Sequence, residues 1–387
     1  MKIIAITSGS YPYGTATSTR NMLLFRGLKE QGFEVALYSI YPDKNQDPQS
    51  CKLADIYEGI PYQYTMNTLK FEKNRVLRIP KMLISTLRCI RYIEKEAKHQ
   101  EVVAFNYINT PILTYIITRR LKRNNIRILH EVTEFPFVLQ HGYFIKSILY
   151  LKRTVPRFDT VFVISTALKS YFDKLTDPDR VKILNMFVDL ERFQSTFEPV
   201  YDFEYIAYCG SMNTDKDGVP ILIEAFSSVA KQYQNLKLVL IGDIENRPID
   251  QNITENIRKF SLDNNIVFTG HINPTQIPKY LNGAKILALA RPDNIQAKGG
   301  FPTKLGEYLA TGKPVVVTKV GDIPKFITHE VNGFLSEPNS KDFADKLLKV
   351  LHNYNQAIEV GKSGKQLAFE KFDYKQNVRK VITYLNL

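Results

Sequence analysis

Short apolar runs suited to buried strands alternate along the chain with longer segments of helical period. In the first half the strand-like runs are "KIIAITS", "EVALYSI", "EVVAFN", "IRILHE" and "DTVFVIS", and a helical pattern covers residues 17–31. Strands that alternate with helices in this way predict a parallel sheet with helices packed on its faces.

The same pattern restarts in the second half with "YIAYCGS", "LKLVLIG", "NIVFTG", "KILALA" and "PVVVT". The stretch before it, residues 191–204, is polar and aromatic without strong periodicity, and we interpret it as a linker. The prediction is an α/β protein with two Rossmann-like domains, residues 1–195 and 200–370. These domains would face each other across a cleft at the carboxyl ends of their strands, where such sheets bind ligands. One large doubly wound sheet is the alternative.

Length and composition agree with two domains, because 387 residues that are 44% hydrophobic exceed what one core usually organises. Three cysteines, Cys51, Cys89 and Cys209, lie far apart, which argues against a disulfide framework or a cysteine zinc site and favours a reducing, cytoplasmic setting. The first apolar run is too short for a secretory signal, and no apolar run reaches the roughly 18 residues of a membrane span.

The charge favours an anionic partner. Lys and Arg outnumber Asp and Glu by 52 to 39, a formal net charge of +13. Nucleotide phosphates, an acidic lipid surface and nucleic acid would all suit this charge. Zinc-finger spacing, an RNP-like aromatic motif and an arginine-rich tail are all missing from the sequence, so we expect no nucleic-acid partner.

Residues 69–98 combine a helical period with nine basic and three acidic residues. The predicted apolar face consists of Val76, Ile79, Leu83, Leu87, Ile90 and Ile93. A second basic and apolar stretch spans residues 144–158. Both stretches are either ordinary domain helices with solvated basic faces or a surface that docks on anionic lipid.

The segment "KGGFPTKLGEYLATGKPVVVT", residues 298–318, carries the most specific chemistry. Thr303 is placed to begin a helix, and the first amides, at Lys304 and Leu305, would be suited to holding phosphate. Glu307 follows four residues after Thr303, close enough to the cleft to accept hydrogen bonds from a ribose diol. The alternative is that Glu307 only favours the helix N-terminus.

Gly299 and Gly300 precede this helix, and glycines let a ligand approach the backbone closely. Together with Phe301 they complete the predicted donor-binding loop before the helix. The same reasoning applies to "YPYGTATSTRN" near the N-terminus, where Gly14 and Thr15 form a glycine turn before a helix and are weaker candidates for contact with phosphates or an acceptor.

These residues resemble the retaining nucleotide-sugar glycosyltransferases of family 4, which have the GT-B fold. The resemblance rests on "FPTKLGEYLATGKPVVVTKVGDIPKFI", "VNGFL", "GVPILIEAF", "LVLIGD", "VFTGHI" and "ILNMFVDLERF", and more loosely on "SYPYGTATSTRN" and "QGFEVALYS". It implies that a hexose passes from a UDP- or GDP-linked donor to a glycan or lipid-linked acceptor in cell-surface polysaccharide synthesis. It also implies that the C-terminal helix, residues 371–387, packs back on the first domain.

Two departures from the family pattern limit what the resemblance implies. Many members have two glutamates eight positions apart, and Glu307 matches the second while Gly299 stands at the first. Ser211 stands where an arginine is usual, and Lys216 lies one position from the usual lysine. Lys216 is therefore the predicted phosphate ligand and a catalytic candidate, with Lys304 or Arg291 replacing the missing charge. Arg291 directly follows the strand "KILALA".

His130 closes the strand "IRILHE" at its carboxyl end, and the resembling enzymes often have a histidine there that touches the donor sugar. Glu131 and Glu134 are candidates to orient His130 or the acceptor hydroxyl, and packing or loop capping is the alternative for His130. The histidines show no metal-ligand spacing. Asp215–Asp217 spell a D-x-D that we expect to cap a loop, so the prediction is no metal cofactor.

The function predicted from the sequence is thus a glycosyltransferase that works in the cytoplasm, peripherally at the inner face of the membrane. A nucleotide-sugar epimerase or phosphorylase of the same fold and a non-catalytic nucleotide-sugar-binding protein remain alternatives. A nicotinamide-dependent oxidoreductase is excluded, because neither half has G-x-G-x-x-G directly after its first strand.

Overall fold

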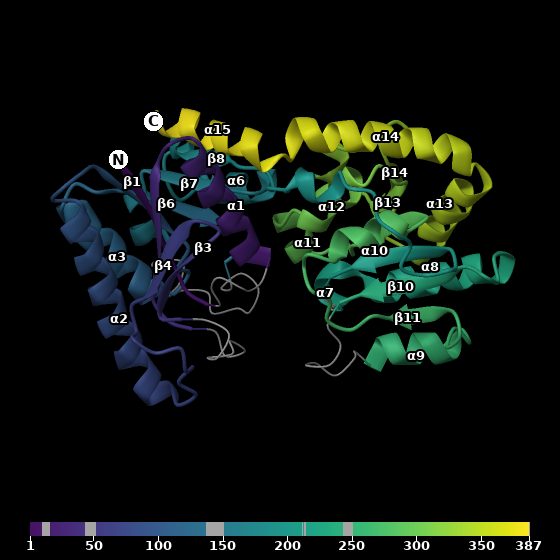
Figure 1. Cartoon of the computed structure of the whole chain (residues 1–387), viewed down its shortest axis with the longest axis horizontal. Coiled ribbons are helices and arrows are strands. Elements are labelled where there is room, and N and C mark those ends of the chain that lie inside the picture. Colours follow the sequence, from purple (N-terminus) through teal and green to yellow (C-terminus); the bar gives the residue numbers. More distant parts are fainter. Residues whose placement is uncertain are drawn as a thin grey trace. The chain divides into compact units, whose positions relative to one another are not determined.

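The structure is a computed structural model that describes residues 1–9, 16–42, 52–136, 151–210, 212, 214–242 and 251–386. The chain divides into two compact units, Met1–Asn185 with Asn377–Leu387, and Met186–Gln376. Each unit contains its own mainly parallel sheet with helices on both faces (Figure 1). This arrangement confirms the predicted pair of Rossmann-like bodies and excludes a single large sheet.

The first unit is built on an eight-stranded sheet in the order β3-β4-β2-β1-β5-β6-β7-β8. All neighbouring strands are parallel except β3 and β4, which form an antiparallel pair at one edge. The strands are β1 (Lys2–Thr7), β2 (Glu34–Ser39), β3 (Ala54–Tyr57), β4 (Ile60–Tyr64), β5 (Val102–Asn106), β6 (Arg127–Val132), β7 (Thr160–Val163) and β8 (Val181–Ile183).

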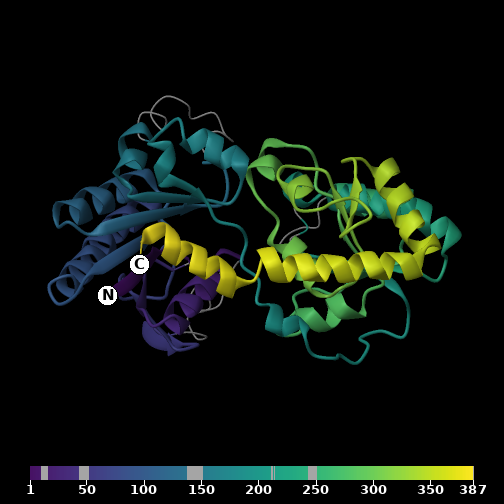
Figure 2. The ribbon, with the colours of Figure 1, turned by 90° about the horizontal axis from the view of Figure 1, so that it is seen from above.

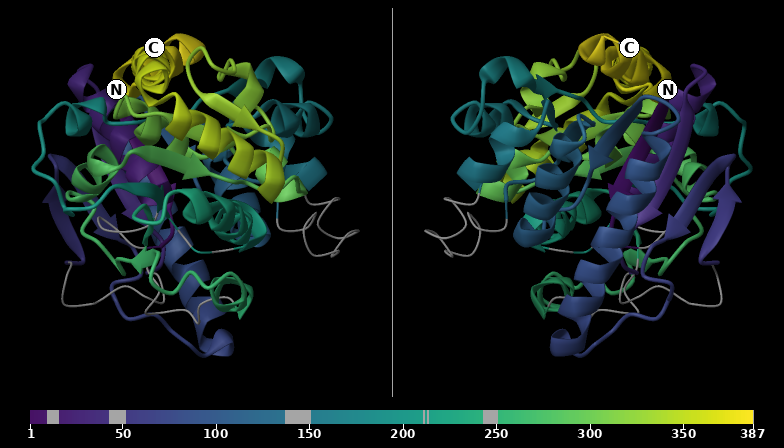
Figure 3. Two further views of the ribbon diagram at one scale, coloured as in Figure 1. Left: turned by 90° about the vertical axis from the view of Figure 1, so that its right-hand side faces the viewer. Right: turned by 90° about the vertical axis from the view of Figure 1, so that its left-hand side faces the viewer.

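Helices cover both faces of this sheet. Phe25 of α1 packs edge-on against Phe105 of β5, and Tyr384 of α15 lies against Phe162 of β7, so α1 and α15 cover one face. Helices α2 and α3 lie side by side on the other face (Figure 3). The helical elements of this unit are α1 (Ala16–Glu30), α2 (Arg75–Glu96), α3 (Pro111–Arg123), η1 (Val155–Arg157), α6 (Thr166–Phe172) and η2 (Pro178–Arg180), together with most of α15 (Tyr374–Leu385).

Helix α2 begins after Asn74, whose side chain accepts a hydrogen bond from the amide of Val76. Its buried residues are Ser85, Thr86, Cys89, Ile90 and Ile93. The predicted apolar face is therefore wrong at Val76, Ile79 and Leu87, which are exposed, whereas its last two members, Ile90 and Ile93, are buried. The buried face of α2 includes the small or polar residues Ser85, Thr86 and Cys89, which a search for apolar periodicity does not detect.

The second unit is built on a six-stranded, fully parallel sheet in the order β11-β10-β9-β12-β13-β14. Four-residue runs such as "VVVT" are buried completely, as expected for strands with helices on both sides. The strands are β9 (Tyr205–Cys209), β10 (Lys237–Ile241), β11 (Ile266–Phe268), β12 (Ile286–Leu289), β13 (Val315–Thr318) and β14 (Phe334–Ser336).

The helical elements of the second unit include α14, the longest of them, which is seen along its full length in Figure 2. The segment "RPDNIQAKGG" between β12 and α12 contains the short helix α11. The elements are η3 (Leu190–Phe193), α7 (Thr214–Asp217), α8 (Val219–Gln232), α9 (Gln251–Lys259), α10 (Ile277–Gly283), α11 (Ile295–Gly299), α12 (Thr303–Ala310), η4 (Ile323–Lys325), α13 (Ser340–His352) and α14 (Tyr354–Lys371).

The chain enters the second unit earlier than the expected linker. Val188 and Phe372 are joined by a backbone hydrogen bond of 2.9 Å, and Tyr374 donates one of 3.1 Å back to Val188. Met186 and Val188 also pack against Gly306 of α12 so closely that a Cβ there would lie 2.5 Å and 2.6 Å from their side chains. Residues 186–190 therefore belong to the second unit, and the linker expected at residues 191–204 lies within it.

In the described parts of the chain, every helix is too short or too polar to cross a membrane.

Candidate functional site

The carboxyl end of the second sheet gathers most of the polar residues predicted from the sequence. Strand β9 ends at Cys209, and Gly210 follows with φ of +147°, a conformation that favours glycine. Strand β12, its neighbour in the sheet, leads through α11 to the helix α12. The N-terminal turn of α12 thus lies at the edge of a parallel sheet where ligands usually bind.

Lys304, in the first turn of α12, is held by two side chains from neighbouring elements. Its Nζ lies 2.7 Å from Oδ1 of Asp217 on α7 and donates a hydrogen bond of 2.9 Å to the hydroxyl of Tyr208 on β9. A Cβ on Gly210 would lie 2.1 Å from Cε and 2.4 Å from Nζ of Lys304. Gly210 is therefore required for the ammonium group to occupy this position.

Burial controls the electrostatics of this cluster. Desolvation lowers the pKa of Lys304, while the Asp217 carboxylate opposes the shift. Desolvation likewise raises the pKa of the Tyr208 hydroxyl far above its usual range, with Asp217 adding to the effect, so Tyr208 stays neutral. A weakly solvated lysine ammonium fixed by a carboxylate is well suited to meet an incoming anion.

A second contact fixes α12 to the end of β9. The Tyr308 hydroxyl accepts a hydrogen bond of 2.7 Å from the backbone amide of Cys209, and the Tyr308 ring is completely buried. Tyr308 lies one turn after Lys304 and next to Glu307, so this contact sets the position of the first turn of the helix relative to the strand.

Glu307 lies in the middle of α12 with its carboxylate partly exposed, at 26%. Oε1 lies 3.4 Å from Nη1 of Arg192, a residue of η3. Burial raises the pKa of Glu307, and the positive charges of Arg192 and Lys304 oppose that shift. The structure therefore brings Lys304 and Glu307 together on one helix, as the sequence predicted, and adds Arg192, which was not predicted.

The residues before α12 have mainly structural contacts. Arg291 is 1% exposed and donates a hydrogen bond of 3.3 Å to the carbonyl of Ala297, and its own carbonyl accepts from Thr318. Phe301 packs against Phe326 and Phe372 in an aromatic cluster. These contacts hold the polypeptide between β12 and α12 in place, which is a supporting role for the predicted Arg291 and Phe301.

The backbone around the first turn of α12 agrees with the sequence prediction. Gly299 and Gly300 are buried immediately before it, Thr303 is its first residue, and Leu305 is buried in the core. Pro302 precedes the helix and offers no side-chain cap, but its carbonyl accepts a hydrogen bond of 3.1 Å from the Leu305 amide, so of the two predicted phosphate-binding amides only that of Lys304 remains a candidate.

The D-x-D motif lies in the short helix α7 rather than in a loop. Its last residue, Asp217, is 6% exposed and pairs with Lys304, so its carboxylate supports the lysine. Gly218 follows with φ of +66° and lies so close to the carbonyl of Ala290 that a Cβ would be 1.8 Å from the oxygen. Lys216, the predicted phosphate ligand, is half-buried on α7.

In the first unit His130 is 7% exposed and its ring stacks on Phe158 at a centroid distance of 4.5 Å. Nδ1 lies 2.9 Å from the carbonyl oxygen of Asn106. The side-chain Nδ2 of Asn106 lies farther from Nδ1, at 3.2 Å, and donates a hydrogen bond of 3.0 Å to the Ile108 carbonyl. Because a carbonyl only accepts, we assign the ring proton to Nδ1, which leaves Nε2 as an acceptor. Burial lowers the pKa of His130 to about 4, so the ring is neutral near pH 7.

Glu131, the next residue, belongs to the opposite face of the sheet, because side chains alternate along a strand. Its Oε1 lies 2.6 Å from Nη2 and 2.7 Å from Nε of Arg20 on α1. Arg20 also donates to the carbonyls of Leu184 and Asn185. The structure therefore does not join Glu131 to His130, and Asn106 orients the imidazole instead. Glu134 lies on the exposed surface after β6.

Gly14, Thr15 and Ser211 lie outside the residues that the structure describes. The described ranges also contain no cluster of three or more His, Cys, Asp or Glu side chains arranged to hold a metal ion. Of the second basic stretch, residues 151–158 are described, and Val155 and Phe158 are buried in the first core.

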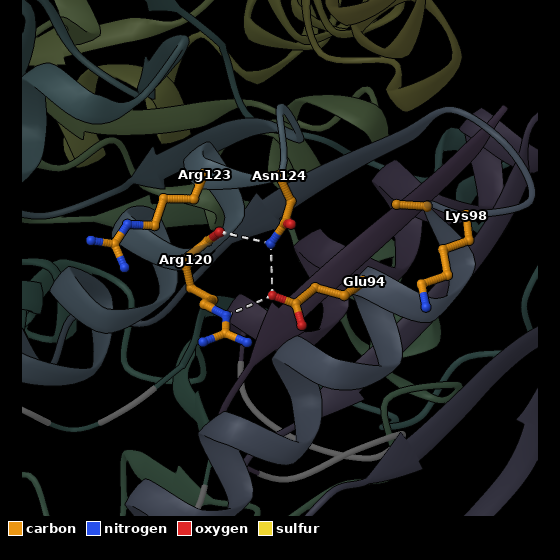
Figure 4. A pocket seen from close by; sticks show the side chains of 6 residues that line it. Glu94, Lys98, Arg120, Arg123 and Asn124 are labelled. Atoms are coloured by element: carbon orange, nitrogen blue, oxygen red, sulfur yellow. Dashed lines mark hydrogen bonds and ion pairs between the residues drawn. The ribbon is translucent and has the colours of Figure 1, made fainter.

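A hollow of about 410 Å³ lies where α2 and α3 end (Figure 4). Arg120 and Asn124 both donate 2.8 Å hydrogen bonds to Oε1 of Glu94, and Lys98 and Arg123 lie at its rim. Cations are expected beside helix C-termini, because they complement the negative end of the helix dipole. This hollow therefore has a structural explanation and is not the candidate site.

Comparison with known proteins identifies the type of domain in the second unit. Residues 204–353 match the family model described as glycosyl transferases group 1. The second unit therefore contains a glycosyltransferase group 1 domain, and this domain includes Lys304 and Glu307.

Three curated relatives have similar sequences. The lipopolysaccharide 1,2-N-acetylglucosaminetransferase of Salmonella typhimurium is 24% identical over 186 residues, 45% of each chain. An uncharacterized glycosyltransferase of Methanocaldococcus jannaschii is 24% identical over 69% of this chain and 71% of its own. The amylovoran biosynthesis glycosyltransferase AmsK of Erwinia amylovora is 25% identical over 47% of this chain and 44% of its own. The matched part thus spans under half of two of these relatives.

Solved structures resemble the whole chain. Sucrose-phosphate synthase from Thermosynechococcus elongatus has a TM-score of 0.76 at 16% identity and covers 100% of this chain and 98% of its own. Anabaena HepE in complex with UDP has a TM-score of 0.74 at 16% identity and covers 100% of both chains. The fold is therefore that of the GT-B glycosyltransferases, and the comparisons together support a glycosyltransferase.

Proposed function

We propose that the protein is a retaining glycosyltransferase of family 4 that transfers a hexosyl unit from a nucleoside diphosphate donor to a glycan or lipid-linked acceptor in cell-surface polysaccharide synthesis. The observation that carries the proposal is the position of Lys304, which pairs with Asp217, and of Glu307, which contacts Arg192, on the same helix α12 at the carboxyl end of the second sheet. A cation for a diphosphate and a carboxylate for a ribose lie there one turn apart on a single helix.

Each residue of α12 has a defined part in this proposal. The backbone amide and the side-chain ammonium of Lys304 meet the diphosphate, since both carry positive charge at a helix N-terminus. The Glu307 carboxylate accepts hydrogen bonds from the two ribose hydroxyls. UDP is the proposed nucleotide, since HepE, which has the same fold, is known in complexes with UDP and with UDP-glucose.

The reaction breaks the bond between the anomeric carbon and the oxygen of the β-phosphate. The electron pair of that bond leaves with the diphosphate, the acceptor oxygen forms the new bond to the anomeric carbon, and the hydroxyl proton passes to the leaving phosphate. Fixed positive groups that meet the developing negative charge lower the barrier. Lys304 is preorganised for this by Tyr208 and Asp217, and we propose that no divalent metal takes part.

His130 is proposed to accept a hydrogen bond from a hydroxyl of the transferred sugar. Its Nδ1 proton is engaged by the Asn106 carbonyl, and its low pKa keeps the ring neutral, so Nε2 is available as an acceptor. Glu131 is proposed to hold Arg20, which binds the backbone carbonyls of Leu184 and Asn185, and not to contact the reacting atoms. Its Oε1 is already bonded to the Arg20 guanidinium.

We propose further that the enzyme docks on an anionic membrane surface through α2. With about 100° per residue, Val76, Leu77, Ile84 and Leu87 lie within about 100° of the helix circumference. The buried Ser85, Cys89 and Ile93 lie on the other side of it. The four apolar side chains are 44–77% exposed.

Lys81 and Arg88 border this apolar face of α2 on one side, and Arg91 lies within it. Exposed apolar side chains bordered by cations are typical of helices that lie at the interface of an anionic bilayer. A lipid-linked acceptor would be met there. Flotation with vesicles of anionic or neutral lipid tests this proposal. The Leu77→Ser/Ile84→Ser variant should bind anionic vesicles more weakly than the wild type. The control Ile112→Ser, which changes an exposed residue on α3, should bind them as well as the wild type does. Absence of binding to anionic vesicles at low salt would favour a soluble acceptor.

A thermal-shift screen with UDP, GDP, UDP-glucose and GDP-mannose tests the donor proposal. A ligand at 100 times its dissociation constant adds about 2.7 kcal/mol of stability, which is readily measured. We expect either the UDP or the GDP compounds to raise the melting temperature of the wild type, and the same compounds to raise that of Glu307→Ala much less. No response to any of the four would reject the proposed donor class.

The alternatives are an epimerase or phosphorylase of the same fold and a non-catalytic nucleotide-sugar-binding protein. Gly299 and Ser211 keep the binding-protein alternative open, because each departs from the pattern of the resembling family. An epimerase would convert the donor without an acceptor, and a binding protein would shift its melting temperature without turnover.

A further inference from the structure

Arg192 joins two elements at the carboxyl end of the second sheet. Nη1 lies 3.4 Å from Oε1 of Glu307 on α12, and Nη2 donates a hydrogen bond of 2.5 Å to the carbonyl of Pro274. Pro274 lies in the segment after β11, and α12 follows β12. Strands β11 and β12 are separated in the sheet by β10 and β9, so the guanidinium connects segments from across the sheet.

The Glu307 carboxylate needs a nearby cation to stay ionised, because burial opposes its charge. The other charged or titratable groups that face it are Lys304 on its own helix, the neighbouring Tyr308, and the Cys209 thiol at the end of β9. Tyr308 and Cys209 are neutral near pH 7 and offer no positive charge. The Lys304 ammonium pairs with Asp217 at 2.7 Å, whereas the Arg192 guanidinium contacts Glu307 at 3.4 Å.

We infer that Arg192 is a positioning residue of the donor site, which holds the Glu307 carboxylate ionised and aimed so that it can accept hydrogen bonds from the ribose of the nucleotide. The inference rests on the proposed donor site. An ionised carboxylate accepts two hydroxyl hydrogen bonds, whereas a protonated one offers a weaker acceptor and a competing donor. Arg192 is 28% exposed and is therefore partly screened by solvent, so its effect is expected to be moderate.

The first test needs no nucleotide. Because the pKa of Glu307 is raised in the folded chain, the folded state binds its proton more tightly, and ionisation of Glu307 lowers stability as the pH rises. Arg192 reduces that loss. We therefore expect Arg192→Gln to lower the melting temperature by about 1–3 °C at pH 8 and by much less at pH 4.5.

In a Glu307→Gln background the same substitution should show no such dependence on pH. An equal effect of Arg192→Gln at both pH values, or in both backgrounds, would overturn the inference, because the arginine would then stabilise the fold independently of Glu307.

The second test is titration calorimetry with UDP. Arg192→Gln should weaken UDP binding about fivefold at pH 7.5, with a larger loss at pH 6, and Arg192→Lys should restore part of it. Lys319→Gln is the matched control, since it removes one cation from an exposed pair with Glu337 in the same unit. Unchanged or tighter binding by Arg192→Gln would overturn the positioning role. If the wild type bound no UDP, UDP would be rejected as the donor nucleotide. The pH dependence of the melting temperature would still show whether Arg192 stabilises the ionised form of Glu307.

Discussion

Replacement of Gly210 by alanine tests the arrangement around Lys304 without removing any charge. The added methyl carbon would lie 2.1 Å from Cε and 2.4 Å from Nζ of Lys304. Carbon atoms in contact are about 3.5 Å apart, so the end of the lysine must retreat by about 1.4 Å. That movement cannot preserve both its 2.7 Å contact with Asp217 and its 2.9 Å hydrogen bond to Tyr208.

The expected magnitude follows from that displacement. A misplacement of about 1 Å in a catalytic group can cost on the order of 100-fold in rate, so we expect kcat/KM of Gly210→Ala to fall by about 10- to 100-fold. Backbone strain adds to the effect on stability, because φ of +147° costs a residue with a Cβ about 1–3 kcal/mol.

The assay measures release of nucleoside diphosphate from the donor, together with the melting temperature. Gly32→Ala is the matched control, since Gly32 has φ of +89° and nothing within 4 Å of an added Cβ. It should lose stability through strain but retain kcat/KM. A folded Gly210→Ala enzyme with kcat/KM within twofold of the wild type would refute the role assigned to the position of Lys304.

Three further predictions concern other features. Folding lowers the pKa of His130 from 6.5 to about 4, so the unfolded chain takes up a proton at a higher pH than the folded chain. The free energy of unfolding should therefore fall by about 3 kcal/mol as the pH falls from 6.5 to 4. His130→Gln should remove this pH dependence when the free energy of unfolding is measured by urea denaturation at several pH values. Arg20→Met should lower the free energy of unfolding by about 3–5 kcal/mol, because Glu131 is left buried and unpaired, and Arg20→Met/Glu131→Leu should recover much of it in the same measurement. Excess EDTA should leave sugar transfer nearly intact, whereas complete loss restored by Mn²⁺ or Mg²⁺ would show a metal requirement and return Asp217 to consideration as a ligand.

Much of the fold follows from local patterns in the sequence. Strands β1, β2, β5, β9, β12 and β13 are short, strongly apolar runs between helical segments, and each lies where the pattern predicts. The antiparallel pair β3 and β4 was not predicted, because its residues are half-exposed at a sheet edge and lack a continuous apolar run. Strands β8 and β14, of three residues each, were also not among the predicted strands.

The candidate site was predicted only in part, for a physical reason. Lys304 and Glu307 were found because they lie on one helix whose start is marked by Gly300 and Thr303. Arg192, Tyr208 and Asp217 come from three other elements, and their contacts with α12 depend on strand order, which a single sequence does not contain.

His130 and Glu131 show the same limit at closer range. Their position at the end of a strand was predicted, but the alternation of side chains sends them to opposite faces of the sheet. Recognition of the strand alone would have allowed this conclusion, because adjacent residues on a strand do not share a face.

Transfer of a sugar from a nucleotide donor is the central claim, and turnover measures it most directly. The purified full chain is incubated with UDP-glucose, UDP-N-acetylglucosamine and GDP-mannose in turn, with a lipid extract as the acceptor source, and both released nucleoside diphosphate and labelled sugar in the lipid or glycan fraction are measured. We predict that one donor gives equal amounts of nucleoside diphosphate and transferred sugar, and that Glu307→Ala lowers the amounts of both about tenfold or more. Interconversion of a nucleotide sugar without acceptor, or binding without either product, would contradict it.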